Sequence, residues 1–132
     1  MKRLMIGLGF RDQAPAHSID EVLARAVRKA AMPNVATVLA IVEDKAAHPS
    51  LVAVMRGSQF PIETVTADAM READARIATR SDRVIRQRGV GSVCEATALA
   101  AAGVFARLVV TRIVSTDRTA TAAAALTEEP AP

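Results

Sequence analysis

The chain has 132 residues, which fits one domain with a single hydrophobic core. Aromatic residues make up only 2%, with no Trp or Tyr, and this excludes the aromatic stacking platforms that single-stranded nucleic-acid binders use. The net charge of +3 comes from arginines interleaved with acids rather than gathered in one stripe. We therefore expect no nucleic-acid partner and an attraction for anionic small molecules instead.

Cysteine, histidine and hydropathy patterns limit the compartment and the cofactors. The single cysteine, Cys94, excludes an internal disulfide, and His17 and His48 lack the spacing of metal ligands. No apolar run reaches the length of a membrane span, and the apolar stretch after the basic start is too short for a signal peptide. We expect a cytoplasmic protein with no metal, no cofactor and no membrane partner.

The first third of the chain predicts a strand, a helix and a second strand. Residues 3–8 form a buried strand that ends in a glycine-containing loop. Ser18 is predicted to cap a helix over residues 19–31, with Glu21 at the third position as in a capping box. The β-branched run 35–42 is typical of a central strand.

The middle of the chain predicts shorter elements. A helix over residues 51–56 is opened by a Pro-Ser pair and is followed by a short strand over 60–65. Residues 66–88 predict a short helix and an irregular connector. This stretch is rich in arginine and is either a solvated face or, in a sharper interpretation, an anion-binding rim. Its arginines are Arg76, Arg80, Arg83, Arg86 and Arg88.

The stretch from residue 89 to 103 is the most informative part of the sequence. Gly89 and Gly91 allow a close backbone approach, and Ser92 with Glu95 predicts a capping box that opens an alanine-rich helix ending at Gly103. The bare N–H groups of such a helix start favour a carboxylate or phosphate. The alternative is a structural turn with a good cap.

The last part of the chain predicts a β-hairpin, with strands over 106–114 and 119–126 and a turn at Asp117 and Arg118. Residues 127–132 are expected to form a flexible tail after one domain over residues 1–126. Strands that alternate with helices predict an α/β sandwich with a mostly parallel sheet, made mixed by the hairpin.

Ligands of such sheets bind at the carboxyl ends of the strands, where three predicted features converge. These are the loop after the first strand, with Arg11 able to reach an anion, Lys45 after the second strand, and the helix start at Ser92. The loop has only half of a dinucleotide fingerprint, because Gly7 and Gly9 lack a third glycine.

Two further residues have two interpretations each. Lys45 either binds an anion or acts in acid–base chemistry, or it pairs locally with the neighbouring Glu43 and Asp44. Cys94 has either a thiol pKa lowered by the helix dipole or, as we prefer, a packing role. The residues alone therefore predict an α/β domain with an anion-binding edge and no recognisable catalytic grouping.

Several segments in their expected order resemble the CobE/CbiG C-terminal domain family of cobalamin biosynthesis. They are residues 6–11, 40–51, 89–96 and the following strand 107–112, and the resemblance extends from Leu4 to about Leu126. It implies a three-layer α/β/α sandwich with a mixed, mostly parallel sheet of about five strands and a C-terminal hairpin. It also implies a role in building the corrin ring of vitamin B12, here as the stand-alone CobE type of the aerobic route.

The resemblance implies that a corrinoid or precorrin intermediate is bound through its carboxylates, and the shared positions are the predicted ligand-binding residues: Gly7, Gly9, Arg11, Lys45, Gly91, Ser92 and Glu95. The chain departs from the family at four positions, where the family often has Cys, a basic residue, Gly and an acid: Phe10, Asp12, Gln13 and His48. These departures favour a carrier or accessory role. The alternatives are an enzyme with a hydrolase or ring-modifying activity on a precorrin, and an assembly subunit that binds other enzymes of the pathway.

Overall fold

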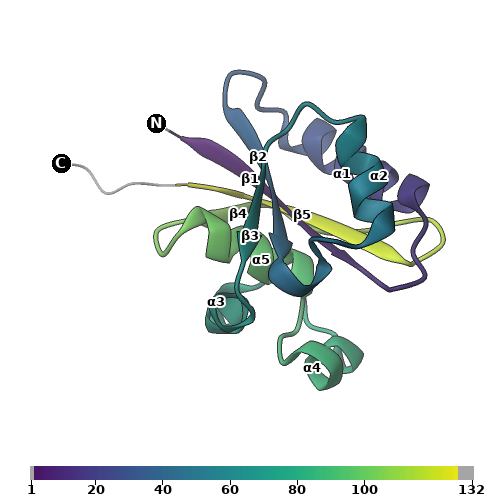
Figure 1. Ribbon diagram of the computed structural model, residues 1–132. Helices are drawn as coiled ribbons and strands as arrows, with labels where there is room; N and C mark the ends of the chain where they lie inside the picture. The colour runs from purple at the N-terminus through teal and green to yellow at the C-terminus, as the bar shows by residue number, and fades with distance from the viewer. Residues whose placement is uncertain (1, 128–132) are drawn as a thin grey trace.

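The computed structural model describes residues 2–127, which place a five-stranded sheet between two layers of helices (Figure 1). One face of the sheet is covered by α1 (Ala16–Ala30) and α2 (Pro49–Arg56), and the other by α3 (Ala67–Glu72) and α5 (Val93–Ala102). The three-layer α/β/α architecture implied by the family resemblance is thereby confirmed.

The strands follow the order β3-β2-β1-β5-β4 across the sheet. Parallel pairing joins β1 to β2 and β2 to β3, whereas β5 pairs antiparallel with both β1 and β4. Because only β5 runs in the opposite direction, the carboxyl ends of the other four strands meet at one edge. The bounds are β1 (Arg3–Phe10), β2 (Ala36–Val42), β3 (Ile62–Val65), β4 (Arg107–Val114) and β5 (Ala120–Leu126).

Short helical segments fill the connections near this edge. A 3-10 turn, η1 (Glu43–Lys45), follows β2, and a second one, η2 (Ala73–Arg76), follows α3. A further helix, α4 (Asp82–Arg88), stands apart from the sheet at the level where the strands end (Figure 1). Residues 66–88 therefore form three helical segments, where the sequence predicts one short helix and a connector.

Alternation along the strands divides the apolar residues between two cores. On β1, Leu4, Ile6 and Leu8 pack toward α1 and α2, whereas Met5 belongs to the core under α5. Alanines dominate β5, and all of Ala122 to Ala125 are buried, so small side chains fill the sheet beside β1. Among residues 2–127, no aromatic side chain is fully buried.

Two predicted local features of the N-terminal half are wrong. The first strand does not end at residue 8, because β1 continues to Phe10 through antiparallel pairing with Ala120 of β5. Ser18 does not cap α1, which begins at Ala16 with Pro15 in the N-cap position. The buried hydroxyl of Ser18 instead donates a 2.6 Å hydrogen bond to Asp117 in the hairpin turn.

The first residue of the predicted tail, Thr127, is held by the fold. Thr127 is buried, its backbone N–H donates to the carbonyl of Arg3, and its hydroxyl oxygen accepts a 2.7 Å hydrogen bond from the Arg3 backbone N–H. Residues 128–132 of the predicted tail lie outside the described residues. Within residues 2–127, the structure contains no helix that is long and apolar enough to cross a membrane.

Candidate functional site

A cavity of about 500 Å³ opens at the carboxyl edge of the sheet. It is lined by the ends of β1, β2 and β4, by the turn between β4 and β5, and by α4. Its apolar lining includes Leu8, Val42, Val84 and Val93. Its cationic lining residues come from five segments of the chain and are Arg11, Lys45, Arg83, Arg88, Arg112 and Arg118.

Only two of these cations have an acidic partner among residues 2–127. The Lys45 Nζ lies 2.5 Å from Asp12 Oδ1, and the Arg88 guanidinium binds both carboxylate oxygens of Asp44, at 2.9 and 3.0 Å. The remaining four make no ion pair with a described acidic side chain: Arg11, Arg83, Arg112 and Arg118. The cavity therefore has an excess of positive charge, as an anion-binding site requires.

The corner around Lys45 joins the loop after β1 to the segment after β2. Lys45 pairs with Asp12 on the other loop, whereas the predicted local partners were Glu43 and Asp44. Its hydrogen bond and charge hold the pKa of the Asp12 carboxyl below its usual range. The Lys45 side chain is 18% exposed, and its Nζ lies 5.3 Å from the centroid of the Phe10 ring.

The two glycines of β1 allow close packing, and only Gly9 reaches the cavity. A Cβ on Gly7 would lie 2.0 Å from the carbonyl oxygen of Cys94, so the backbone of α5 rests directly on β1 at this point. A Cβ on Gly9 would lie 2.8 Å from Thr121 Oγ1. Of the two, Gly9 alone is a lining residue.

The start of α5 differs from its prediction, although its first residue, Val93, lines the cavity. Ser92 occupies the N-cap position but makes no side-chain capping bond, so the predicted capping box is wrong. Ser92 and Glu95 are both fully buried. The N–H of Gly91 donates a 2.8 Å hydrogen bond to Asp74, and neither Gly91 nor Ser92 lines the cavity.

The Glu95 carboxylate is occupied by donors from two other segments. Its Oε1 accepts from the backbone N–H groups of Ala78 and Thr79, and its Oε2 accepts from the Thr79 hydroxyl and the Arg112 backbone N–H, each at 2.8 Å. The bond to Arg112 falls where the pairing of β4 with β5 shifts register. Glu95 therefore joins the segment before α4 to the irregular part of β4, from which Arg112 lines the cavity.

Cys94 is a packing residue, as preferred from the sequence. It is fully buried in α5 against β1. Burial raises the pKa of the thiol to about 11, opposite to the lowering that the helix dipole alone predicts.

Sequence reasoning missed Arg112 and Arg118 as lining residues. It identified the arginine run before Gly89 as a rim in one of its two interpretations, and Arg83 and Arg88 of that run do line the cavity. Arg76 and Arg80 instead bind protein groups outside it. The signal available for Arg118 was its place in a predicted hairpin turn, but a charged turn residue is normally solvated.

Fold and cavity together define a three-layer α/β/α protein with a cation-rich cavity at the carboxyl edge of its sheet. Residues 4–125 match the model of the family described as cobalamin synthesis G C-terminus. The chain belongs to this family and is a protein of cobalamin biosynthesis.

Individual relatives agree with this assignment. The chain is 30% identical over 118 residues to Protein CobE of Sinorhizobium sp, covering 89% of this chain and 77% of that protein. It is similar to the crystal structure of cobalamin biosynthesis protein chiG from Agrobacterium tumefaciens str. C58, with a TM-score of 0.70 and 31% identity over 96% of this chain and 99% of that chain. The fold is also that of the crystal structure of CobE, a protein from the cobalamin (vitamin B12) biosynthetic pathway, with a TM-score of 0.81, 24% identity and coverage of 97% and 94%.

Proposed function

We propose that the chain binds a corrinoid or precorrin intermediate in the carboxyl-edge cavity and acts as a carrier or accessory factor. The observation that carries this proposal is the set of four lining arginines without an acidic partner among residues 2–127. A guanidinium binds a carboxylate through two parallel hydrogen bonds, and corrinoid intermediates carry several carboxylates around an apolar ring. The apolar lining residues supply surface for the ring.

Three of the seven residues predicted to bind the ligand keep that role in the proposal, because they line the cavity: Gly9, Arg11 and Lys45. In the proposal the other four do not contact the ligand and instead hold the lining segments in place. They are bonded to or packed against protein groups: Gly7, Gly91, Ser92 and Glu95. Lys45 would exchange the exposed Asp12 carboxylate for a carboxylate of the ligand.

A titration with hydrogenobyrinic acid, followed by visible absorbance, tests the proposal. We expect a saturable shift of the pigment spectrum at one ligand per chain, with the unchanged pigment recovered after denaturation. Arg11→Ala should weaken binding by about tenfold, the effect of losing one charged hydrogen-bonding partner. Arg28→Ala on α1, away from the cavity, is the matched control and should bind like the wild type.

Two results would overturn the proposal in different ways. If the wild type leaves the spectrum unchanged at every protein concentration, the cavity does not bind this class of pigment. If a new pigment accumulates and is released, the chain is an enzyme rather than a carrier.

A further inference from the structure

The turn between β4 and β5 holds one arginine in an unfavourable backbone conformation. Arg118 has φ of +65°, in the left-handed region where glycine is the usual residue. Its backbone N–H donates to the carbonyl of Ser115 at 2.9 Å, which closes the turn. The turn thus carries a long charged side chain at a backbone conformation that favours glycine.

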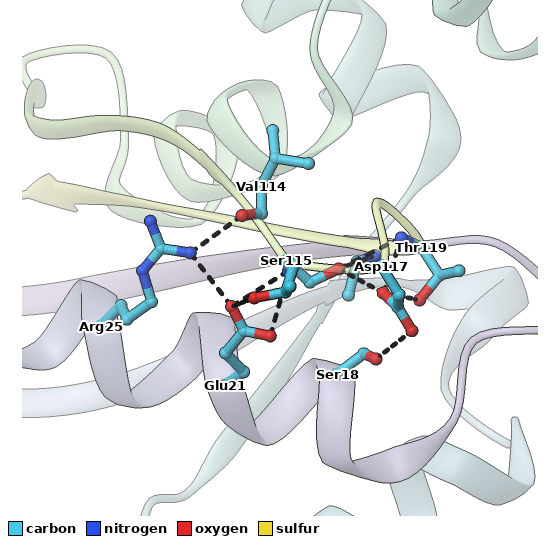
Figure 2. Close-up of polar contacts among 9 residues, drawn as sticks. Ser18, Glu21, Arg25, Val114, Ser115, Asp117 and Thr119 are labelled. Atoms are coloured by element: carbon cyan, nitrogen blue, oxygen red, sulfur yellow. Dashed lines mark hydrogen bonds and ion pairs between the residues drawn. The ribbon is translucent and has the colours of Figure 1, made fainter.

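Asp117 fixes this conformation from within the turn. Its Oδ1 accepts hydrogen bonds from the hydroxyls of Ser115 and Thr119, each at 2.7 Å, and from the Thr119 backbone N–H at 3.1 Å. Its Oδ2 accepts the hydroxyl of Ser18 on α1 (Figure 2). These hydrogen bonds hold the turn in one conformation. The backbone of Arg118, the next residue, therefore stays in the left-handed region.

A second set of bonds holds the turn against α1. Glu21 accepts hydrogen bonds from the backbone N–H and hydroxyl of Thr116, and Arg25 donates to the carbonyl of Val114 at 2.9 Å (Figure 2). On the other side, the backbone N–H of Arg11 donates to the carbonyl of Thr119. This bond places the turn beside Arg11, which also lines the cavity.

We propose that Arg118 determines the affinity of the cavity for its ligand by binding a carboxylate on the side of the cavity where Arg11 lies. The inference rests on the proposed function. Strained residues persist where the surrounding structure holds them, and they gather at ligand sites. Here the strain places a guanidinium, without an acidic partner among residues 2–127, in the cavity lining. A ligand with more than one carboxylate can bind both Arg118 and Arg11.

Arg118→Gly tests the inference because it should change stability and affinity in opposite directions. Relief of the strain should raise the Tm by about 2–4 °C, and loss of the guanidinium should weaken the binding of hydrogenobyrinic acid by about tenfold. Arg118→Asn, whose side chain tolerates the left-handed conformation, separates loss of the guanidinium from a loosened glycine turn and should lose the same affinity. Arg118→Lys keeps charge and strain and should show the wild-type Tm with a smaller loss of affinity.

The outcomes separate this inference from the proposed function. Failure of the wild type to bind the pigment would overturn the proposed function. Wild-type binding together with unchanged affinity in Arg118→Gly and Arg118→Asn would overturn only the role of Arg118. A lower Tm in Arg118→Gly would show that the turn does not hold strain at this residue.

Discussion

Glu95 is a fully buried carboxylate whose two oxygens accept four hydrogen bonds from protein groups. A buried charged group is tolerated only when the protein supplies its hydrogen bonds. Removal of one partner leaves the remaining polar groups buried without a hydrogen bond, which lowers the stability of the folded state. Three of its four donor groups lie in the segment before α4, and the fourth lies on β4. The side chain therefore supports two of the cavity walls that carry arginines, α4 and β4.

Glu95→Gln should lower the free energy of unfolding by about 2 kcal/mol or more. The amide nitrogen cannot accept the hydrogen bonds of either the Arg112 N–H or the Thr79 hydroxyl that Oε2 now accepts. Urea denaturation measures the difference. Glu72→Gln, on the exposed end of α3, is the matched control and should be within about 0.5 kcal/mol of the wild type. Equal losses in both variants would contradict the assigned role.

Gly7→Ala should lower the free energy of unfolding by about 3 kcal/mol or more, because its new Cβ would overlap the backbone of α5 at Cys94 and Ala98. Gly57→Ala is the control, because its Cβ would meet nothing closer than 3.9 Å. It should be neutral or slightly stabilising. Thermal unfolding of both variants, compared with the wild type, checks the pair. A folded Gly7→Ala protein with wild-type stability would show that α5 does not rest on β1 as described.

At the scale of elements, the β4–β5 hairpin and α1 are joined through Asp117. Hydrogen bonds from Ser18, Ser115 and Thr119 hold the pKa of the Asp117 carboxyl well below its usual range. The ionised carboxylate thus stabilises the folded state. This contribution is present above the pKa of an unfolded aspartate, about 4, and is lost as the pH falls through the lower folded value.

Asp117→Asn should therefore lower the Tm at pH 7, and the gap to the wild type should narrow as the pH falls below about 4. Thermal unfolding between pH 2.5 and 7.5 measures this dependence. Asp20→Asn, on the exposed surface of α1, provides the control and should show no such narrowing. A gap that stays constant down to the lowest pH would contradict the role of the ionised Asp117.

The elements themselves were predictable where they depend on local pattern. The β-branched run before Glu43 and the hairpin with its turn at Asp117 both follow from composition and spacing, and the structure confirms them. The capping residues were not predictable, because Ser18 and Glu95 have the local pattern of caps but bond to groups that the fold brings from elsewhere. For Ser18 the partner is 99 residues away.

At the scale of the whole molecule, the cavity combines segments from Leu8 to Thr121, which spans nearly the entire chain. The sequence predicted the edge where it lies, because parallel strands bring their carboxyl ends together. It did not predict the contribution of Arg112, because an arginine in an edge strand normally faces solvent. Only the register shift of β4 and the bond to Glu95 explain its place in the cavity lining.

The binding of hydrogenobyrinic acid should weaken several-fold between 50 and 500 mM NaCl, because screening reduces attraction between carboxylates and partly exposed arginines. Titrations at four salt concentrations, using the absorbance of the pigment, give the dependence. The same pigment with its carboxylates converted to amides provides the comparison and should bind weakly at every salt concentration. An affinity that salt does not change would indicate that the apolar lining carries the binding.

The mutual hydrogen bonds of Arg3 and Thr127 have a consequence for how the molecule can be handled. They hold the start of β1 beside the end of β5, at the edge of the sheet opposite the cavity (Figure 1). A short linker between these positions would permit circular permutation, with new ends opened in an exposed loop. A molecule tethered to a surface through either position would present the carboxyl-edge cavity outward.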